Sequence, residues 1–306
     1  MFPIIPTLIF STDSWLRKYT MYLYQLSFVF LFGAINTFDI PRNNNCTSDL
    51  TIDNDQYKVA GVYHIGDSFP TDTQYDKYGN LFFVEAGRST QGYYFDGKMI
   101  KANSSTPEKI SGLPDGLCYS VAVDKKNMKV YFGTGKGIYN YNYDSEDTTL
   151  ISSPDLKSNN LYVDKDGNKY ITQSPDGVEQ LYLLSDKRKI RFKTFDALDE
   201  LAVDDDNNFY FIREEKLFVL KSNLSSPIFV GNVTYDGYAQ ITFNKDKVFV
   251  ASETLNYLHE NDTGKLKQVK SAPENITAVA FDYSHNLVIG TRGKIIKYKN
   301  NETGVC

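Results

Sequence analysis

The residue types that most often carry catalysis or bind metal ions are few and scattered in this chain of 306 residues. It contains three histidines and three cysteines, which are His64, His259, His285, Cys46, Cys118 and Cys306. No Cys-x-x-Cys pair and no Cys/His cluster occurs, so a zinc site is not expected. No Ser, His and Asp stand in a pattern typical of a nucleophilic triad. The chain is therefore expected to bind a ligand rather than to catalyse a reaction.

The side chains best suited to binding recur five residues before a repeated aspartate. This position is occupied in turn by Thr71, Tyr119, Asn159, Asp199, Ala239 and Thr277. Its polar neighbours are Asp72, Asn160, Glu200 and Gln240. Within this set we expect ligand contacts from Tyr119, Asn159, Asp199, Glu200 and Gln240. Together they offer hydrogen bonds and an aromatic ring, which suits recognition of a small molecule.

The repeated aspartate belongs to an internal repeat that runs through most of the chain. Apolar residues end in Asp, a polar turn follows, and an apolar aromatic stretch comes next, as in SVAVDKKNMKVYFG and ELAVDDDNNFYFI. The repeated position is Asp76, Asp124, Asp164, Asp204, Asn244 and Asp282. The steps between copies are 48, 40, 40, 40 and 38 residues. We interpret the repeated Asp as the residue that ends a strand and caps its turn, not as a catalytic or calcium-binding residue.

Six hairpins at this spacing predict an all-β fold. Further short strands are expected between the hairpins, at 137–143, 178–184, 216–221 and 294–299. Four strands in about 40–45 residues is the period of a propeller blade. The sequence thus predicts a six-bladed β-propeller with four-stranded antiparallel blades over residues 57–306. The inner strands would line a central channel, with the ligand at its mouth.

The segment 57–66 (YKVAGVYHIG) precedes the first hairpin and reads as a strand. We expect it to supply the outer strand of the last blade and so to close the ring. Closure would bring the chain ends together, which predicts a Cys46–Cys306 disulfide and leaves Cys118 as a free thiol. A Cys118–Cys306 pair remains as the alternative.

The N-terminal 38 residues resemble a secretory signal region. An apolar run spans residues 21–38, with Arg17 and Lys18 just before it. Met21 offers a second start for translation. Small and polar residues close the run, which favours cleavage over a signal anchor that would hold the protein in a membrane. Residues 39–56 are then expected to form an N-terminal linker, and no stable membrane insertion is expected after cleavage.

Seven Asn-x-Ser/Thr motifs agree with secretion to an extracellular compartment. They begin at Asn45, Asn103, Asn223, Asn232, Asn261, Asn275 and Asn301. The net charge of −5 argues against a nucleic-acid partner. The 23 tyrosines and 20 phenylalanines favour β structure and include rings that could stack on a planar ligand.

The repeat phrases at 121–142, 160–172 and 201–212 resemble those of insect ommochrome-binding proteins. The resemblance implies a six-bladed propeller, secreted into insect hemolymph, that carries a planar, tryptophan-derived pigment. It implies no cofactor other than a bound pigment. What protein partners the chain has is left open.

Two other classes compete with this interpretation. The repeat also resembles the gluconolactonase family of propellers, which hold a divalent metal through a Glu, an Asn and an Asp at the counted position. Asn159 and Asp199 fit that pattern, but Thr71 stands where the Glu is expected. A metal-dependent lactonase or hydrolase is the first alternative. An extracellular protein-interaction propeller, of the YWTD-repeat or yellow-protein kind, is the second.

Overall fold

The computed structural model describes residues 48–153, 156–185, 189–235, 237–260 and 266–301. Over these ranges the chain is almost entirely strand and turn. The helical element found there is one 3₁₀ turn, η1 (Lys193–Phe195). In the described part of the chain, no helix is long and apolar enough to cross a membrane.

The strands form six antiparallel sheets, five of them four-stranded. Sheet 1 consists of β3 (Phe69–Tyr75), β4 (Leu81–Ser89), β5 (Gly92–Ile100) and β6 (Glu108–Lys109). Sheet 2 consists of β7 (Cys118–Asp124), β8 (Lys129–Thr134), β9 (Gly137–Asn142) and β10 (Asp147–Leu150). Sheet 3 consists of β11 (Leu161–Val163), β12 (Lys169–Gln173), β13 (Gln180–Leu184) and β14 (Lys189–Phe192).

The remaining sheets continue the series along the chain. Sheet 4 consists of β15 (Glu200–Val203), β16 (Phe209–Arg213), β17 (Lys216–Leu220) and β18 (Ile228–Asn232). Sheet 5 consists of β19 (Gln240–Asn244), β20 (Lys247–Ala251), β21 (Leu255–His259) and β22 (Lys267–Gln268). Sheet 6 is five-stranded and consists of β23 (Ile276–Phe281), β24 (Leu287–Thr291), β25 (Lys294–Asn300), β2 (Asp55–His64) and β1 (Leu50–Ile52).

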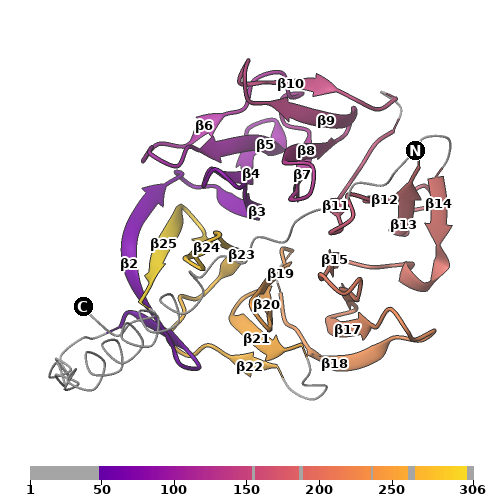
Figure 1. Cartoon of the computed structure of the whole chain (residues 1–306). Coiled ribbons are helices and arrows are strands. Elements are labelled where there is room, and N and C mark those ends of the chain that lie inside the picture. The colour runs from indigo at the N-terminus through magenta and orange to yellow at the C-terminus, as the bar shows by residue number, and fades with distance from the viewer. Residues whose placement is uncertain (1–47, 154–155, 186–188, 236, 261–265, 302–306) are drawn as a thin grey trace, which may run out of the picture. The chain divides into compact units, whose positions relative to one another are not determined.

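In each sheet, the strand that begins the repeat hairpin faces the middle of the described region, and we call these six the inner strands (Figure 1). They are β3, β7, β11, β15, β19 and β23. Each inner strand contacts the next in this order, and β23 contacts β3. The inner strands therefore follow one another around a common centre.

Each repeat copy forms the hairpin between an inner strand and its neighbour. At the first turn, Oδ1 of Asp76 accepts the backbone N–H groups of Tyr78 and Asn80, each at 2.8 Å. Its Oδ2 accepts the side-chain amide of Asn80 at 2.8 Å. Asp164 and Asp204 bond their own turns in the same way. The predicted structural role of the repeated Asp is confirmed, because its carboxylate accepts hydrogen bonds from backbone N–H groups of the turn.

Sheet 6 combines strands from both ends of the described chain. As predicted, the segment around 57–66 joins the last sheet, since β2 pairs antiparallel with β25. The expectation of four strands is wrong for this sheet, because β1 adds a fifth strand outside β2. Strand structure also begins at Leu50, inside the segment 39–56 that was expected to be a linker. Leu50 and Ile52 are buried, and this burial keeps the short strand on the sheet.

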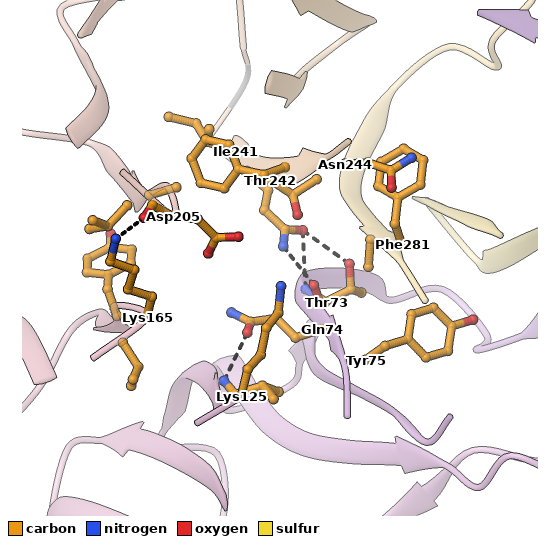
Figure 2. Close-up of a pocket in the computed structure, with 18 of the residues that line it drawn as sticks. Thr73, Gln74, Tyr75, Lys125, Lys165, Asp205, Ile241, Thr242, Asn244 and Phe281 are labelled. Carbon is orange, nitrogen blue, oxygen red and sulfur yellow. Dashed lines mark hydrogen bonds between the residues drawn. The ribbon is translucent and has the colours of Figure 1, made fainter. Parts of the chain in front are cut away.

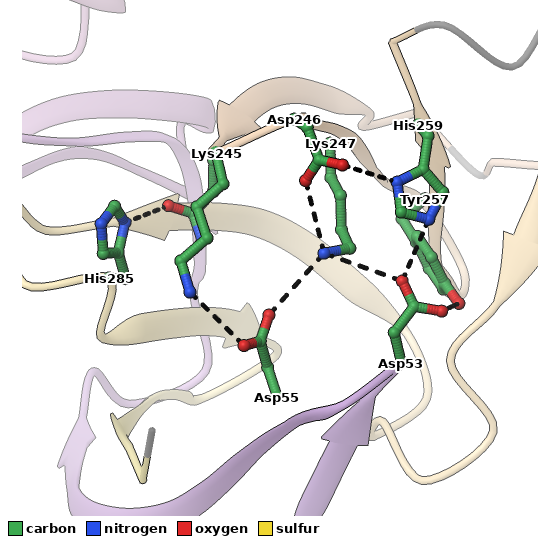
Figure 3. A network of polar contacts seen from close by, with 9 residues as sticks. Asp53, Asp55, Lys245, Asp246, Lys247, Tyr257, His259 and His285 are labelled. Atoms are coloured by element: carbon green, nitrogen blue, oxygen red, sulfur yellow. Dashed lines mark hydrogen bonds and ion pairs between the residues drawn. The ribbon is translucent and has the colours of Figure 1, made fainter. Parts of the chain in front are cut away.

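The turn between β1 and β2 is fastened to sheet 5 by a polar network (Figure 3). The hydroxyl of Tyr257 donates to Oδ1 of Asp53 at 2.6 Å. His259 lies between two carboxylates, with Nε2 3.2 Å from Asp53 and Nδ1 2.9 Å from Asp246. Lys247 Nζ lies 3.6–3.7 Å from oxygens of Asp53, Asp55 and Asp246. The N-terminal hairpin is thereby held to a second sheet as well as to its own.

Aromatic side chains fill the spaces between adjacent sheets. Phe82 and Phe132 are fully buried, as is Phe211. Phe82 meets Tyr141 edge-on at 5.3 Å between ring centroids, whereas Phe211 stacks on Phe218 at 5.4 Å. Much of the high Tyr and Phe content therefore belongs to the core.

Cys118 is a free, fully buried thiol in the cluster between sheets 1 and 2, in line with the prediction. Burial raises the pKa of this thiol well above its ordinary value. The predicted partners Cys46 and Cys306 lie outside the described residues, as does the predicted signal region.

Candidate functional site

A cavity of about 450 Å³ lies among the inner strands, and all six sheets contribute to its wall (Figure 2). Its inner end is lined by Asp72, Tyr162, Glu200 and Gln240. Its outer end is lined by residues at and after the hairpin turns, which include Lys125, Lys165, Asp205, Lys245 and Tyr283. Because these last residues are exposed, the cavity reaches the surface at the face that carries the hairpin turns.

Three residues of the inner end share one repeat position, four residues before the turn Asp or Asn. Asp72 Oδ2 accepts the backbone N–H of Val121 at 2.6 Å. Gln240 Oε1 accepts that of Val279 at 3.1 Å. The Glu200 carboxyl likewise accepts the N–H of Ile241. In each case the donor lies on the next inner strand, three residues before its own turn residue, so these side chains connect neighbouring sheets.

Gln240 also reaches across to sheet 1. Its Oε1 accepts from the N–H and the hydroxyl of Thr73 at 3.2 and 3.1 Å, and its Nε2 donates to Thr73 O at 2.8 Å. Gln74 connects sheets 1 and 2, because its side-chain amide bonds Val121 O and Val123 N at 2.9 Å each. The inner end of the cavity is thus a bonded network of side-chain amides and carboxyls.

The two carboxyl groups of the inner end are poorly solvated. Burial raises the pKa of Asp72 to about 7, although the bonds from Val121 and Gln74 favour its ionised form. Burial also raises the pKa of Glu200 well above its usual range, and the nearby charge of Asp72 raises it further. The pKa of the Tyr162 phenol is raised by burial and by the charges of Glu200 and Asp72. These three groups, from sheets 1, 3 and 4, therefore interact electrostatically inside the cavity.

The outer part of the cavity mixes rings with charges. Tyr75, Phe243 and Phe281 supply aromatic surface, and Tyr283 stands at the exposed edge. Lys165 Nζ donates to Asp205 O, and Lys245 Nζ lies 3.4 Å from Asp55 Oδ1. Planar apolar surface beside a few polar groups is typical of small-molecule sites.

Of the five residues expected to contact a ligand, Glu200 and Gln240 line this cavity, whereas Tyr119, Asn159 and Asp199 do not. The cavity is lined by residues from four positions before the turn onward, whereas a count of five selects Asn159 and Asp199, which lie just before β11 and β15 begin. Tyr119 packs edge-on against Phe95 at 5.4 Å between ring centroids. Ligand contact by any of the five stays a prediction.

Asn159 and Asp199 are engaged in other contacts. Asn159 Nδ2 donates to Glu179 at 3.0 and 3.2 Å and to Ser174 Oγ at 3.0 Å. Asp199 Oδ2 accepts the N–H of Glu214 at 3.2 Å. Among the residues that the structure describes, no three His, Cys, Asp or Glu side chains converge as a metal-binding group.

Sequence reasoning missed Gln74 and Tyr162 and named Asp72 only as a neighbour of Thr71. Each stands two or four residues before a turn Asp, in a strand of mostly apolar or small residues. A polar side chain on the inward face of such a strand is the signal that could have identified them.

The asparagines of the predicted glycosylation motifs lie mostly at the surface. Asn103, Asn223, Asn232 and Asn275 are exposed, and Asn301 is half-buried. Asn45 and Asn261 fall outside the described residues. Their occupancy by sugar stays a prediction.

No family model matches the chain. A curated relative, the ommochrome-binding protein of Manduca sexta, is 23% identical over 193 residues, which cover 62% of this chain and 68% of that protein. Among solved structures, the gluconolactonase XC5397 of Xanthomonas campestris superposes with a TM-score of 0.64 at 12% identity, over 84% of this chain and 96% of that one. A streptogramin B lyase gives a TM-score of 0.49 at 12% identity, over 79% and 97% of the two chains. The likeness to the gluconolactonase shows that the chain has an all-β, propeller-like fold.

Proposed function

We propose that the chain is a six-bladed β-propeller that binds a small planar aromatic ligand, an ommochrome-type pigment, in its central cavity. The six sheets are the blades, and the pairing of β2 with β25 closes the ring. Support for closure comes from the contacts of each inner strand with the next, including β23 with β3.

The observation that carries the binding function is the cavity of about 450 Å³ at the centre of the six sheets. Small-molecule sites commonly measure about 300–1,000 Å³, so a fused-ring ligand fits this volume. Tyr75, Phe243 and Phe281 offer ring surface, and Glu200 and Gln240 offer hydrogen bonds. The similarity to an ommochrome-binding protein supports a pigment as the ligand.

A secreted, glycosylated carrier is the cellular form that we propose. The apolar run at 21–38 and the exposed motif asparagines support it. The Manduca sexta relative, which is named for binding rather than catalysis, supports a carrier over an enzyme.

Titration of the purified glycoprotein with xanthommatin, followed by visible absorbance and tyrosine fluorescence, tests the function. Thr242→Trp should abolish binding, because Thr242 is half-buried in the cavity wall and an indole there would fill it. Thr149→Trp is the matched control, since Thr149 is exposed on β10. Absence of any spectral change with the wild-type protein, or equal binding by both variants, would refute the proposal.

A metal-dependent lactonase is the second candidate. It is favoured by the contact of Asn159 with Glu179, which places an amide next to a carboxylate just before β11 begins. Oxygen ligands of this kind suit a hard divalent cation. Lactone hydrolysis that is lost with a chelator and in Asp199→Ala would support this candidate. Hydrolysis unaffected by both would remove it.

A further inference from the structure

We propose that Asp72 and Glu200 hold a cationic or N–H-donating group of the ligand between them. This rests on the proposed function, because it names the chemistry of the ligand that the cavity takes. Asp72 belongs to β3 of sheet 1, and Glu200 belongs to β15 of sheet 4, three sheets further on (Figure 1). Both line the inner end of the same cavity, so one small ligand can contact both.

The structural role of this repeat position does not require a carboxyl group. Gln240 occupies it in sheet 5, and its amide oxygen accepts the N–H of Val279 at 3.1 Å. Asp72 and Glu200 do the same for Val121 and Ile241. Since an amide is sufficient to connect two inner strands, the negative charge of Asp72 and Glu200 is available for another purpose.

No cation of the described residues neutralises these two carboxyl groups at the inner end. The titratable groups that interact with them are all acidic, and they are Tyr162, Cys118, Asp199 and Tyr235. The lysines that line the cavity directly follow turn residues, at its outer end. A buried carboxyl group without a cation beside it favours its protonated form, and a cationic ligand would stabilise the ionised form instead.

Because the pKa of Asp72 is raised, the affinity for a cationic ligand should depend on pH. Below about pH 7 the Asp72 carboxyl is protonated and offers no charge, and above it the carboxylate forms. A cation favours the ionised form. Affinity for a cationic ligand should therefore increase as the pH rises from 6 to 8, and binding at pH 6 should release protons to the buffer.

Three probes with the same ring test the inference: tryptamine is a cation, tryptophol is neutral and indole-3-acetate is an anion. Each is titrated into the full glycoprotein by calorimetry at pH 6 and pH 8, and by displacement of bound xanthommatin. We expect tryptamine to bind about ten-fold or more tightly than tryptophol at pH 8, with a smaller preference at pH 6. Indole-3-acetate should bind most weakly.

Asp72→Asn and Glu200→Gln should each reduce the preference for tryptamine over tryptophol at pH 8. Both variants keep an oxygen that accepts the neighbouring N–H, and urea unfolding checks that they fold. Asp176→Asn is the control, because Asp176 is exposed and is not among the residues that line the cavity, so the preference should stay intact.

Equal affinities for the three probes at pH 8, or a preference that survives both substitutions, would overturn this inference. So would failure of tryptamine to displace xanthommatin at pH 8. In all these cases binding of xanthommatin leaves the proposed function standing. If xanthommatin itself does not bind, it is the proposed function that fails.

Discussion

The backbone N–H of Val121 donates a 2.6 Å hydrogen bond to Oδ2 of Asp72 and so connects the inner strands of sheets 1 and 2. Asp72 also has a φ of 46°, in the left-handed region that Asp and Asn tolerate better than most residues. Asp72 thus adopts an unusual backbone conformation, connects two sheets and lines the cavity.

Asp72→Ala should lower the free energy of unfolding by about 1–3 kcal/mol, because it leaves the Val121 N–H without its acceptor. Asp72→Asn should unfold at nearly the same urea concentration as the wild type at pH 5, since its amide oxygen still accepts. Equilibrium urea unfolding measures both. An Asp72→Ala protein as stable as Asp72→Asn would show that the bond contributes nothing.

The pKa of Asp72 also predicts how stability depends on pH. Its folded value of about 7 lies above the ordinary 3.8, so the folded state binds a proton that the unfolded state has already lost. This contribution to stability is complete below about pH 4 and disappears as the pH rises toward 7 and beyond. Asp72→Asn should therefore become more stable relative to the wild type as the pH increases. A difference that stays constant from pH 4 to pH 8 would contradict the raised pKa.

Gln240 connects three sheets through one side chain. Gln240→Leu should destabilise the protein by about 2–4 kcal/mol, because the buried N–H groups of Thr73 and Val279 lose their acceptor. Gln91→Leu, at an exposed position in the turn between β4 and β5, is the matched control and should be nearly neutral. Urea unfolding of the two variants side by side gives the comparison, and equal losses would count against a central role for Gln240.

The network around His259 should fail in acid. The pKa of Asp53 is lowered although burial opposes this, because the Tyr257 hydroxyl and the charges of Lys247 and His259 favour its ionised form. An acid with a lowered pKa contributes to stability at pH values above its ordinary pKa of 3.8. This contribution is lost as the pH falls through the pKa of the folded state. Asp53→Asn should cost about 1 kcal/mol at pH 7 and almost nothing near pH 2. Asp176→Asn, at an exposed position, should change nothing at either pH.

Thiol counting tests the cysteine predictions. The native protein should react slowly with an aromatic disulfide reagent, because Cys118 is fully buried and its thiolate is scarce. In urea without reductant, one thiol per chain is expected if Cys46 and Cys306 are paired. A count of three would rule out that disulfide, and a Cys118→Ser protein that shows two thiols rather than none would indicate that Cys118 forms the disulfide instead.

The hairpins could be predicted because they depend on local signals, and the joining of 57–66 to the last sheet could be predicted because this segment precedes the first hairpin of a repeat expected to close into a ring. Asp, Asn and Gly at a fixed position specify turns, and the 40-residue spacing repeats them. Strand β1 was not predicted, because three residues carry little periodicity and Leu50 is held by its place on sheet 6.

Only part of the cavity could be predicted, for a geometric reason. The repeat placed Glu200 and Gln240 near the centre, but it could not show that β15 begins at Glu200 and leaves Asp199 outside the cavity wall. The approach of Asp72 to Tyr162 and Glu200 joins three sheets, and no short-range pattern records it. Raised pKa values of this kind depend on distances that only the folded chain sets.

The shared sheet 6 also constrains how the protein is made. On the ribosome, β2 emerges early, but its partner β25 is among the last described strands to be synthesised. Until then β2 has an unpaired edge that other chains can pair with. A nascent chain that stalls before residue 294 would keep this edge exposed and open to pairing with other chains.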